Sequence, residues 1–128
     1  MGPVALDASV IIGILGADDP HHERALGELR RLNDGRASLQ MAASAYAEVM
    51  VQPLRAKQAE HVEAFLDKLG IDVVAIDRAA ARLAADLRAK HRSLRLGDAL
   101  ALASARIGGA ELLTFDDRLR RVALESPR

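Results

Sequence analysis

Short apolar segments alternate along the chain with longer segments of helical periodicity. The short segments are rich in aliphatic and β-branched residues and lie at 4–6, 38–41, 71–76 and 111–115. Between them, apolar residues recur at intervals of three and four positions, a spacing typical of amphipathic helices. This alternation of strands and helices predicts an α/β fold in which a parallel sheet is covered by helices on both faces.

Local signals predict where several of the helices begin and end. Ser44 is expected to cap the helix after the second strand, and Asp77 the helix after the third. Gly70 is expected to end the helix before the third strand. A further helix is expected over 97–107, and the strand at 111–115 is the last expected element.

Composition narrows the class of protein. The chain has 128 residues, half of them hydrophobic, which fits a single domain over 1–128 with a mainly aliphatic core, since only three residues are aromatic. The absence of cysteine excludes disulfide scaffolds, thiol catalysis and cysteine-based zinc sites, and it is typical of a protein of the reducing cytoplasm. The apolar runs are too short to span a membrane, and we expect no signal peptide because no cationic region precedes the first apolar segment.

The charge balance is neutral, with 18 basic and 18 acidic residues. A protein that binds nucleic acid through phosphates alone is usually basic, whereas a neutral total is compatible with an acidic pocket rimmed by arginine. Two interpretations stay open for the arginine-rich part of the chain, a path for RNA or a solvated helix face. The arginines concerned are Arg78, Arg82, Arg88, Arg92 and Arg95.

Several acidic residues occupy special places in this pattern. Asp7 ends the first strand, Asp116 and Asp117 follow the last, and Asp98 lies at a predicted helix start. Glu48 lies on a helix between small and apolar neighbours. Ligand sites in open parallel sheets lie at the carboxyl ends of the strands, so we expect these carboxylates to converge there.

Converging carboxylates favour a bound cation. Several like charges close together cost several kcal/mol or force some groups to protonate, and a divalent cation removes that cost. Oxygen ligands without histidine or cysteine select Mg²⁺ or Mn²⁺ over Zn²⁺. Such an ion can activate water for in-line attack on a phosphate ester, so the residues predict a metal-dependent phosphodiester hydrolase.

Four segments together carry a resemblance to a known family. They are residues 4–12 with Asp7-x-Ser9, 44–49 around Glu48, 96–105 around Asp98, and 112–119 with Thr114-x-Asp116. In this order they resemble the PIN-domain ribonucleases, and within them the VapC-type toxins of bacterial toxin–antitoxin pairs. Each motif is short, but the four span nearly the whole chain.

The resemblance implies a fold, an activity and a role for each site residue. The implied fold is a three-layer α/β/α sandwich, and the implied activity is Mg²⁺- or Mn²⁺-dependent endonucleolytic cleavage of RNA. A cognate antitoxin and a homodimer are the implied partners. The implied metal-binding acids are Asp7, Glu48, Asp98 and Asp116, with Ser9 and Thr114 as supporting hydroxyls. Asp117 follows Asp116 directly, so the fourth acidic role could be shared or exchanged between them.

Other interpretations of the same residues remain open at this level. Asp7 and Asp98 could simply cap helices, Glu48 could be an ordinary helix residue, and Asp116-Asp117 could mark a turn. A receiver-type or haloacid-dehalogenase-type phosphotransfer domain also gathers acids around Mg²⁺, although here Ser9 occupies the place where the second type has an aspartate. A non-catalytic module with the same fold is the other alternative.

Overall fold

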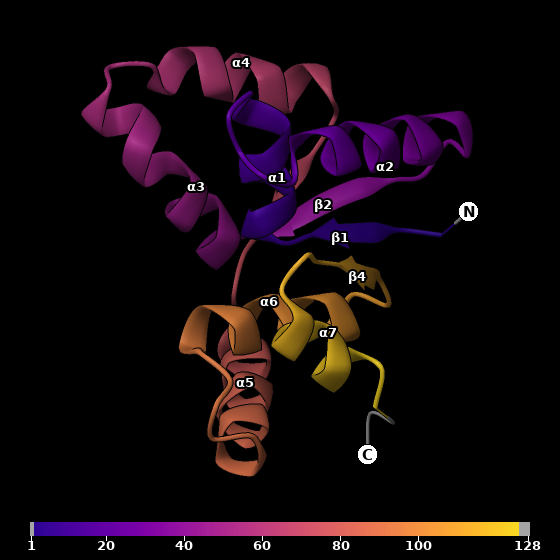
Figure 1. Cartoon of the computed structure of the whole chain (residues 1–128). Helices are drawn as coiled ribbons and strands as arrows, with labels where there is room; N and C mark the ends of the chain where they lie inside the picture. The colour runs from indigo at the N-terminus through magenta and orange to yellow at the C-terminus, as the bar shows by residue number, and fades with distance from the viewer. Residues whose placement is uncertain (1, 126–128) are drawn as a thin grey trace.

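The computed structural model describes residues 2–125 and contains one four-stranded parallel sheet (Figure 1). The strands are β1 (Val4–Leu6), β2 (Leu39–Ala42), β3 (Asp72–Val74) and β4 (Glu111–Leu113), in the spatial order β3-β2-β1-β4. All three strand pairs are parallel. The carboxyl ends of the two central strands, β2 and β1, therefore lie at the same edge of the sheet as that of β4.

Seven helices cover the sheet in the part of the chain that the structure describes. They are α1 (Ala8–Leu15), α2 (His22–Asp34), α3 (Ala43–Arg55), α4 (Ala59–Lys68), α5 (Arg78–Lys90), α6 (Leu96–Ile107) and α7 (Asp117–Ala123). Helices α1 to α4 lie on one side and α5 to α7 on the other (Figure 1). The predicted three-layer α/β/α sandwich is confirmed.

Two aliphatic cores fill the spaces between these layers. The larger packs α1 to α4 against the sheet through side chains such as Leu6, Ile11 and Met41, which are at most 1% exposed. The smaller joins α5, α6 and α7 through Leu102 and Leu119. Burial of such side chains is the main favourable free energy of folding.

The elements differ from the sequence prediction in four places. Ser44 does not cap α3, because β2 leads directly into this helix and Ala42 occupies the cap position. The Ser44 hydroxyl is instead buried and has no hydrogen-bond partner among the described residues. Strands β3 and β4 are shorter than expected, and helix α7 was not predicted at all. The predicted cap at Asp77 is confirmed, since its carboxylate accepts a hydrogen bond from the Ala80 N–H at 2.9 Å.

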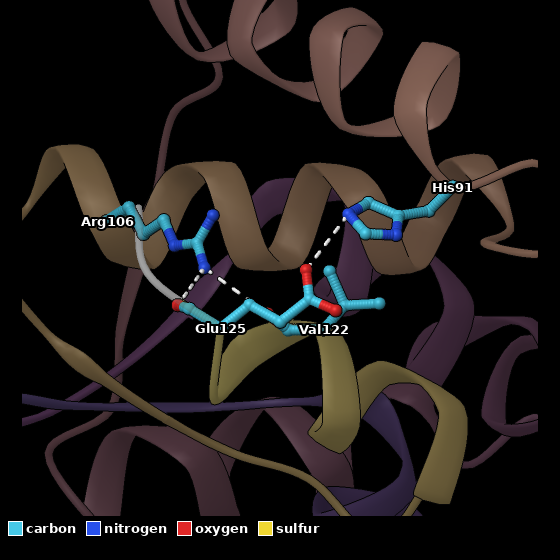
Figure 2. Close-up of polar contacts among 4 residues, drawn as sticks. All are labelled: His91, Arg106, Val122 and Glu125. Atoms are coloured by element: carbon cyan, nitrogen blue, oxygen red, sulfur yellow. Dashed lines mark hydrogen bonds and ion pairs between the residues drawn. The ribbon is translucent and has the colours of Figure 1, made fainter. Parts of the chain in front are cut away.

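Polar contacts hold the end of α7 against α5 and α6. Figure 2 shows Arg106 Nη2 donating to the carbonyls of Val122 and Glu125, each at 3.3 Å. In the same view His91 Nε2 lies 3.4 Å from the Glu125 carboxylate. The Arg106 contacts supply donors to carbonyls at the C-terminal end of α7, where the regular helical hydrogen bonds stop. Within residues 2–125, no helix has the length and apolar character needed to cross the lipid bilayer.

Replacing Gly13 by valine should destabilise the fold. A Cβ atom on Gly13 would lie 3.1 Å from Ala25 Cβ, where α1 packs on α2, whereas a Cβ on Gly27 would meet nothing within 4 Å. We expect Gly13→Val to lower the free energy of unfolding by about 1–3 kcal/mol more than the matched helix change Gly27→Val does, because overpacking strains the interface. Urea unfolding of both variants measures this difference, and equal losses would contradict the close packing of α1 on α2.

Candidate functional site

Asp7 is a buried carboxylate at the carboxyl end of the central strand β1. Asp7 is only 5% exposed, and its backbone N–H donates to the Leu113 carbonyl of β4 at 2.9 Å. Its Oδ2 accepts hydrogen bonds from the Thr114 hydroxyl at 2.8 Å and from the Ser9 hydroxyl at 3.1 Å. Two hydroxyl donors therefore orient this carboxylate and partly compensate for its loss of water.

The same two hydroxyls also join the chain segments that follow β1 and β4. Ser9 Oγ accepts from the backbone N–H of Phe115 at 3.1 Å, and Thr114 Oγ1 accepts from that of Asp116 at 3.1 Å. The two hydroxyl oxygens are 3.4 Å apart. Residues 7–9 and 114–116, distant in sequence, thus form one hydrogen-bonded unit at the edge of the sheet.

Asp98 lies in the first turn of α6 and faces this unit. Burial, together with the negative charges of Asp7 and Asp116, raises the pKa of Asp98 from 3.8 to about 6. The positive charges of Arg95 and Arg118 lower the pKa of Asp98, but by less. Acids from three different parts of the chain therefore influence one another electrostatically at this end of the sheet.

Glu48 reaches the same place from α3. Partial burial raises the pKa of the Glu48 carboxyl, and the charges of Asp7 and Asp98 raise it further, while Arg95 lowers it. A Cβ atom on Gly97 would lie only 2.5 Å from Glu48 Oε1. Gly97 therefore provides the space that the Glu48 carboxylate occupies. Glu48 as a whole nevertheless remains exposed to solvent.

The two adjacent aspartates after β4 occupy different positions. Asp116 is half-buried, contributes to the raised pKa of Asp98, and caps α7 by accepting from the Leu119 N–H through Oδ1 at 2.8 Å. Asp117 is the exposed first residue of α7. Of the pair, Asp116 is thus the acid that interacts with the other carboxylates.

The acids interact electrostatically without forming a compact cluster. Within residues 2–125, none of the four takes part in an ion pair, and no three acidic or histidine side chains lie in an arrangement that could hold a metal ion directly. The donor set nevertheless fits a hard divalent cation, because it consists of carboxylate oxygens that repel one another, and Arg95 and Arg118 offset this repulsion only in part. The four acids are Asp7, Glu48, Asp98 and Asp116.

An aromatic contact beside the site was not predicted from the sequence. The Arg24 guanidinium carbon lies 4.4 Å from the centre of the Phe115 ring, and the His21 ring centre lies 5.1 Å from it. His22 Nδ1 is 2.8 Å from the Gly13 carbonyl. His21 and His22 are both half-buried. No spacing rule connects residues 21–24 with residue 115, so sequence patterns carry no signal for this contact.

An apolar pocket of about 550 Å³ opens next to the acids, between α1, α3 and α4. Its lining includes Glu48 together with apolar residues such as Ile12, Val49 and Phe65. Ile12 is 42% exposed, which is high for a large aliphatic residue. The pocket therefore places exposed apolar surface directly beside a site carboxylate.

Comparison with known families gives one match over almost the entire chain. Residues 4–125 match the family model of the PIN domain. A search of curated proteins found no match.

Solved structures with a similar fold come from several bacteria. The toxin VapC20 of Mycobacterium tuberculosis, described as cleaving the sarcin-ricin loop, has a TM-score of 0.71 at 18% identity, covering 92% of this chain and 93% of that one. A toxin–antitoxin complex from Klebsiella pneumoniae has a TM-score of 0.77 at 20% identity, covering 98% of both chains. VapBC2 of Rickettsia felis, bound to a DNA fragment from its promoter, has a TM-score of 0.72 at 16% identity, covering 95% and 93%. At these identities the likeness concerns the fold.

Replacing Asp98 by asparagine should stabilise the metal-free protein in a pH-dependent way. Because folding raises the pKa of Asp98 to about 6, the folded state binds this proton more tightly than the unfolded state, and the stability it contributes is lost as the pH rises from about 4 to about 6. We expect Asp98→Asn to gain about 1 kcal/mol over the wild type at pH 7 and little at pH 4, the value being reduced by solvent screening of a half-buried group.

Urea unfolding in the presence of a chelator at both pH values measures this change. Asp117→Asn is the matched control, since it removes an exposed carboxylate that does not contribute to the raised pKa of Asp98. A gain for Asp98→Asn that is the same at both pH values would contradict the electrostatic origin.

Proposed function

The chain belongs to the PIN domain family, and on that premise we propose that it is a metal-dependent endoribonuclease that hydrolyses RNA phosphodiester bonds. The observation that supports this most strongly is the raised pKa of Asp98, which burial and the charges of Asp7 and Asp116 produce together. Sites that hold several mutually repelling carboxylates at the end of a parallel sheet are suited to binding a hard cation.

The ion proposed for this site is Mg²⁺, with Mn²⁺ as a substitute. Asp7, Glu48, Asp98 and Asp116 are the residues that would hold it. When bound, such an ion lowers the pKa of a coordinated water and stabilises charge on phosphate oxygens. Loading the site also favours loss of the proton from the Asp98 carboxyl, since a ligand must be deprotonated.

The remaining site residues have supporting parts in this proposal. Ser9 and Thr114 hold Asp7 in one orientation through hydrogen bonds to Oδ2. Arg118 donates from Nη1 to the Ser93 carbonyl at 3.0 Å, which positions its charge at the mouth of the site. With Arg95, it supplies cationic groups suited to phosphate oxygens of an RNA chain. Asp117 is exposed and does not contribute to the raised pKa of Asp98, so in this proposal it lies beside the site without holding the ion.

We further propose that the protein is the toxin of a toxin–antitoxin pair and works in the cytoplasm. The solved structures of similar fold include a toxin and a toxin–antitoxin complex. The apolar pocket beside Glu48 is suited to an inhibitory antitoxin segment, because a chain lying there would also cover the acids. Val51 and Leu54, which are 44% and 63% exposed on α3, provide apolar surface for the proposed homodimer.

The family match removes the support for a receiver-type or haloacid-dehalogenase-type phosphotransfer domain. Asp77 follows the third strand, where a receiver-type domain would need its phosphate acceptor, and here it caps α5. A non-catalytic module with the PIN fold is the remaining alternative, and the experiments below distinguish it from a nuclease.

Purified protein should cleave RNA in the presence of Mg²⁺, and Asp98→Asn should reduce the cleavage rate by on the order of 100-fold or more, because it removes a charged ligand from the site. Gel analysis of a long RNA under single-turnover conditions measures the rate. Asp117→Asn is the control and should retain nearly the full rate. Undiminished cleavage by Asp98→Asn would refute the site assignment, and no cleavage by the wild type with either Mg²⁺ or Mn²⁺ would favour the non-catalytic module.

Expression of the wild-type chain in a bacterial host should arrest growth if it is a toxin. Asp98→Asn should relieve the arrest and Asp117→Asn should not. Co-expression of the short reading frame adjacent to its gene should also restore growth, because the antitoxin would cover the site. An active nuclease whose expression leaves the growth rate unchanged would indicate a housekeeping enzyme. RNA ends sequenced after brief induction would identify the target.

A further inference from the structure

A second hollow, distinct from the acidic site, lies along the outer edge of β4. This groove has a volume of about 490 Å³ and is bounded by α2 on one side and by α6 and α7 on the other. Figure 1 shows β4 at the end of the sheet next to α7. The groove includes every residue of β4 but none of the acids of the proposed metal site.

The backbone of β4 has unused hydrogen-bonding groups in this groove. Within residues 2–125, β4 pairs only with β1 and is an edge strand. The Glu111 N–H donates to the Pro3 carbonyl and the Leu113 carbonyl accepts from the Asp7 N–H, so both residues face β1. Since alternate residues of a parallel strand point to opposite sides, the N–H and C=O of Leu112 point outward. Such an edge is a template for an added strand.

The side chains around this edge are mainly basic. Four arginines and two glutamates line the groove, namely Arg24, Arg31, Arg106, Arg120, Glu28 and Glu111. Arg31 pairs with Glu28 at 2.8 Å. Among residues 2–125, Arg106 donates only to carbonyls and forms no ion pair with an acid (Figure 2). Arg120 has no ion pair or side-chain hydrogen bond to any residue from 2 to 125. The groove therefore favours a negatively charged occupant.

Apolar side chains complete the lining. Leu124, at the C-terminal end of α7, is 78% exposed, and Leu102, Leu112 and Leu113 contribute further aliphatic surface. A suitable occupant thus combines backbone donors and acceptors, acidic groups and apolar groups. An extended peptide supplies all three, because its backbone pairs with the strand while its side chains reach the two walls.

We propose that the β4 edge binds an extended segment, rich in acidic and apolar residues, of a partner protein, which adds as a fifth strand beside Leu112. The proposal does not rest on the nuclease activity, since the groove contains none of the acids of that site. The phosphates of RNA could pair with the arginines, but RNA has no backbone that could form the regular hydrogen bonds of a β-sheet with the strand's N–H and C=O groups. A second copy paired through the same edge would bring its own four arginines against these four.

The test uses the whole protein and a short fluorescein-labelled peptide of alternating glutamate and valine as the probe. Fluorescence polarisation at low salt should show binding. Arg120→Glu should weaken it at least about tenfold, because it places a negative charge in the groove. Arg121→Glu is the matched control, since Arg121 is exposed on the same helix and does not line the groove. Asp98→Asn should bind the peptide as the wild type does, whatever its nuclease activity.

Hydrogen exchange separates strand addition from loose electrostatic attachment. Bound peptide should slow exchange of the Leu112 amide about tenfold or more, while the Leu113 amide, already directed toward β1, should change little. A peptide N-methylated at alternate residues should not bind, because it lacks the donors of a ladder. Equal binding of that peptide, or none by the parent peptide, would overturn the proposal. It would also be overturned if Arg120→Glu weakened RNA binding or self-association instead.

Discussion

Repulsion among acidic side chains at the carboxyl end of the sheet is the constraint around which this molecule is organised. Asp7 is buried there and stays compensated through two hydroxyl donors, Ser9 and Thr114. Asp98 and Glu48 have no such donors in the part of the chain that the structure describes, and burial with neighbouring negative charge raises the pKa of both. In the absence of a bound cation, these carboxylates therefore lower the stability of the folded protein.

The sandwich can sustain this repulsion because each acid lies on or next to a different packed element. Asp7 follows the central strand, Glu48 lies on a helix of the larger core, and Asp98 lies on a helix of the smaller core. Asp116 is further fixed by its cap on α7. Moving any one acid away from the others would disturb the packing of a whole element, so the aliphatic cores stabilise the geometry of the site.

Two surfaces lie beside the acidic site, the pocket next to Glu48 and the groove along β4, and they differ in chemistry. The pocket beside Glu48 is mostly apolar and contains an acid of the site, which is why we associate it with an inhibitory partner. The groove along β4 is basic and contains an open strand edge, which is why we associate it with an acidic extended segment. Thr114 belongs to both regions, since it lines the groove and donates to Asp7. A strand bound along β4 would therefore end next to the residue that orients the buried carboxylate.

The sequence by itself determined the alternation of strands and helices, the aliphatic core, the cap at Asp77 and the four segments that carry the acids. These features depend on periodicity and on hydrogen bonds between near neighbours, which a linear pattern records. Only the tertiary structure decided that Asp116 rather than Asp117 faces the other acids, that Gly97 makes room for Glu48, and that Arg24 packs on Phe115. It also decided that Ser44 does not cap α3 and that β4 has an open edge. Each depends on contacts between segments far apart in the chain, for which local spacing carries no information.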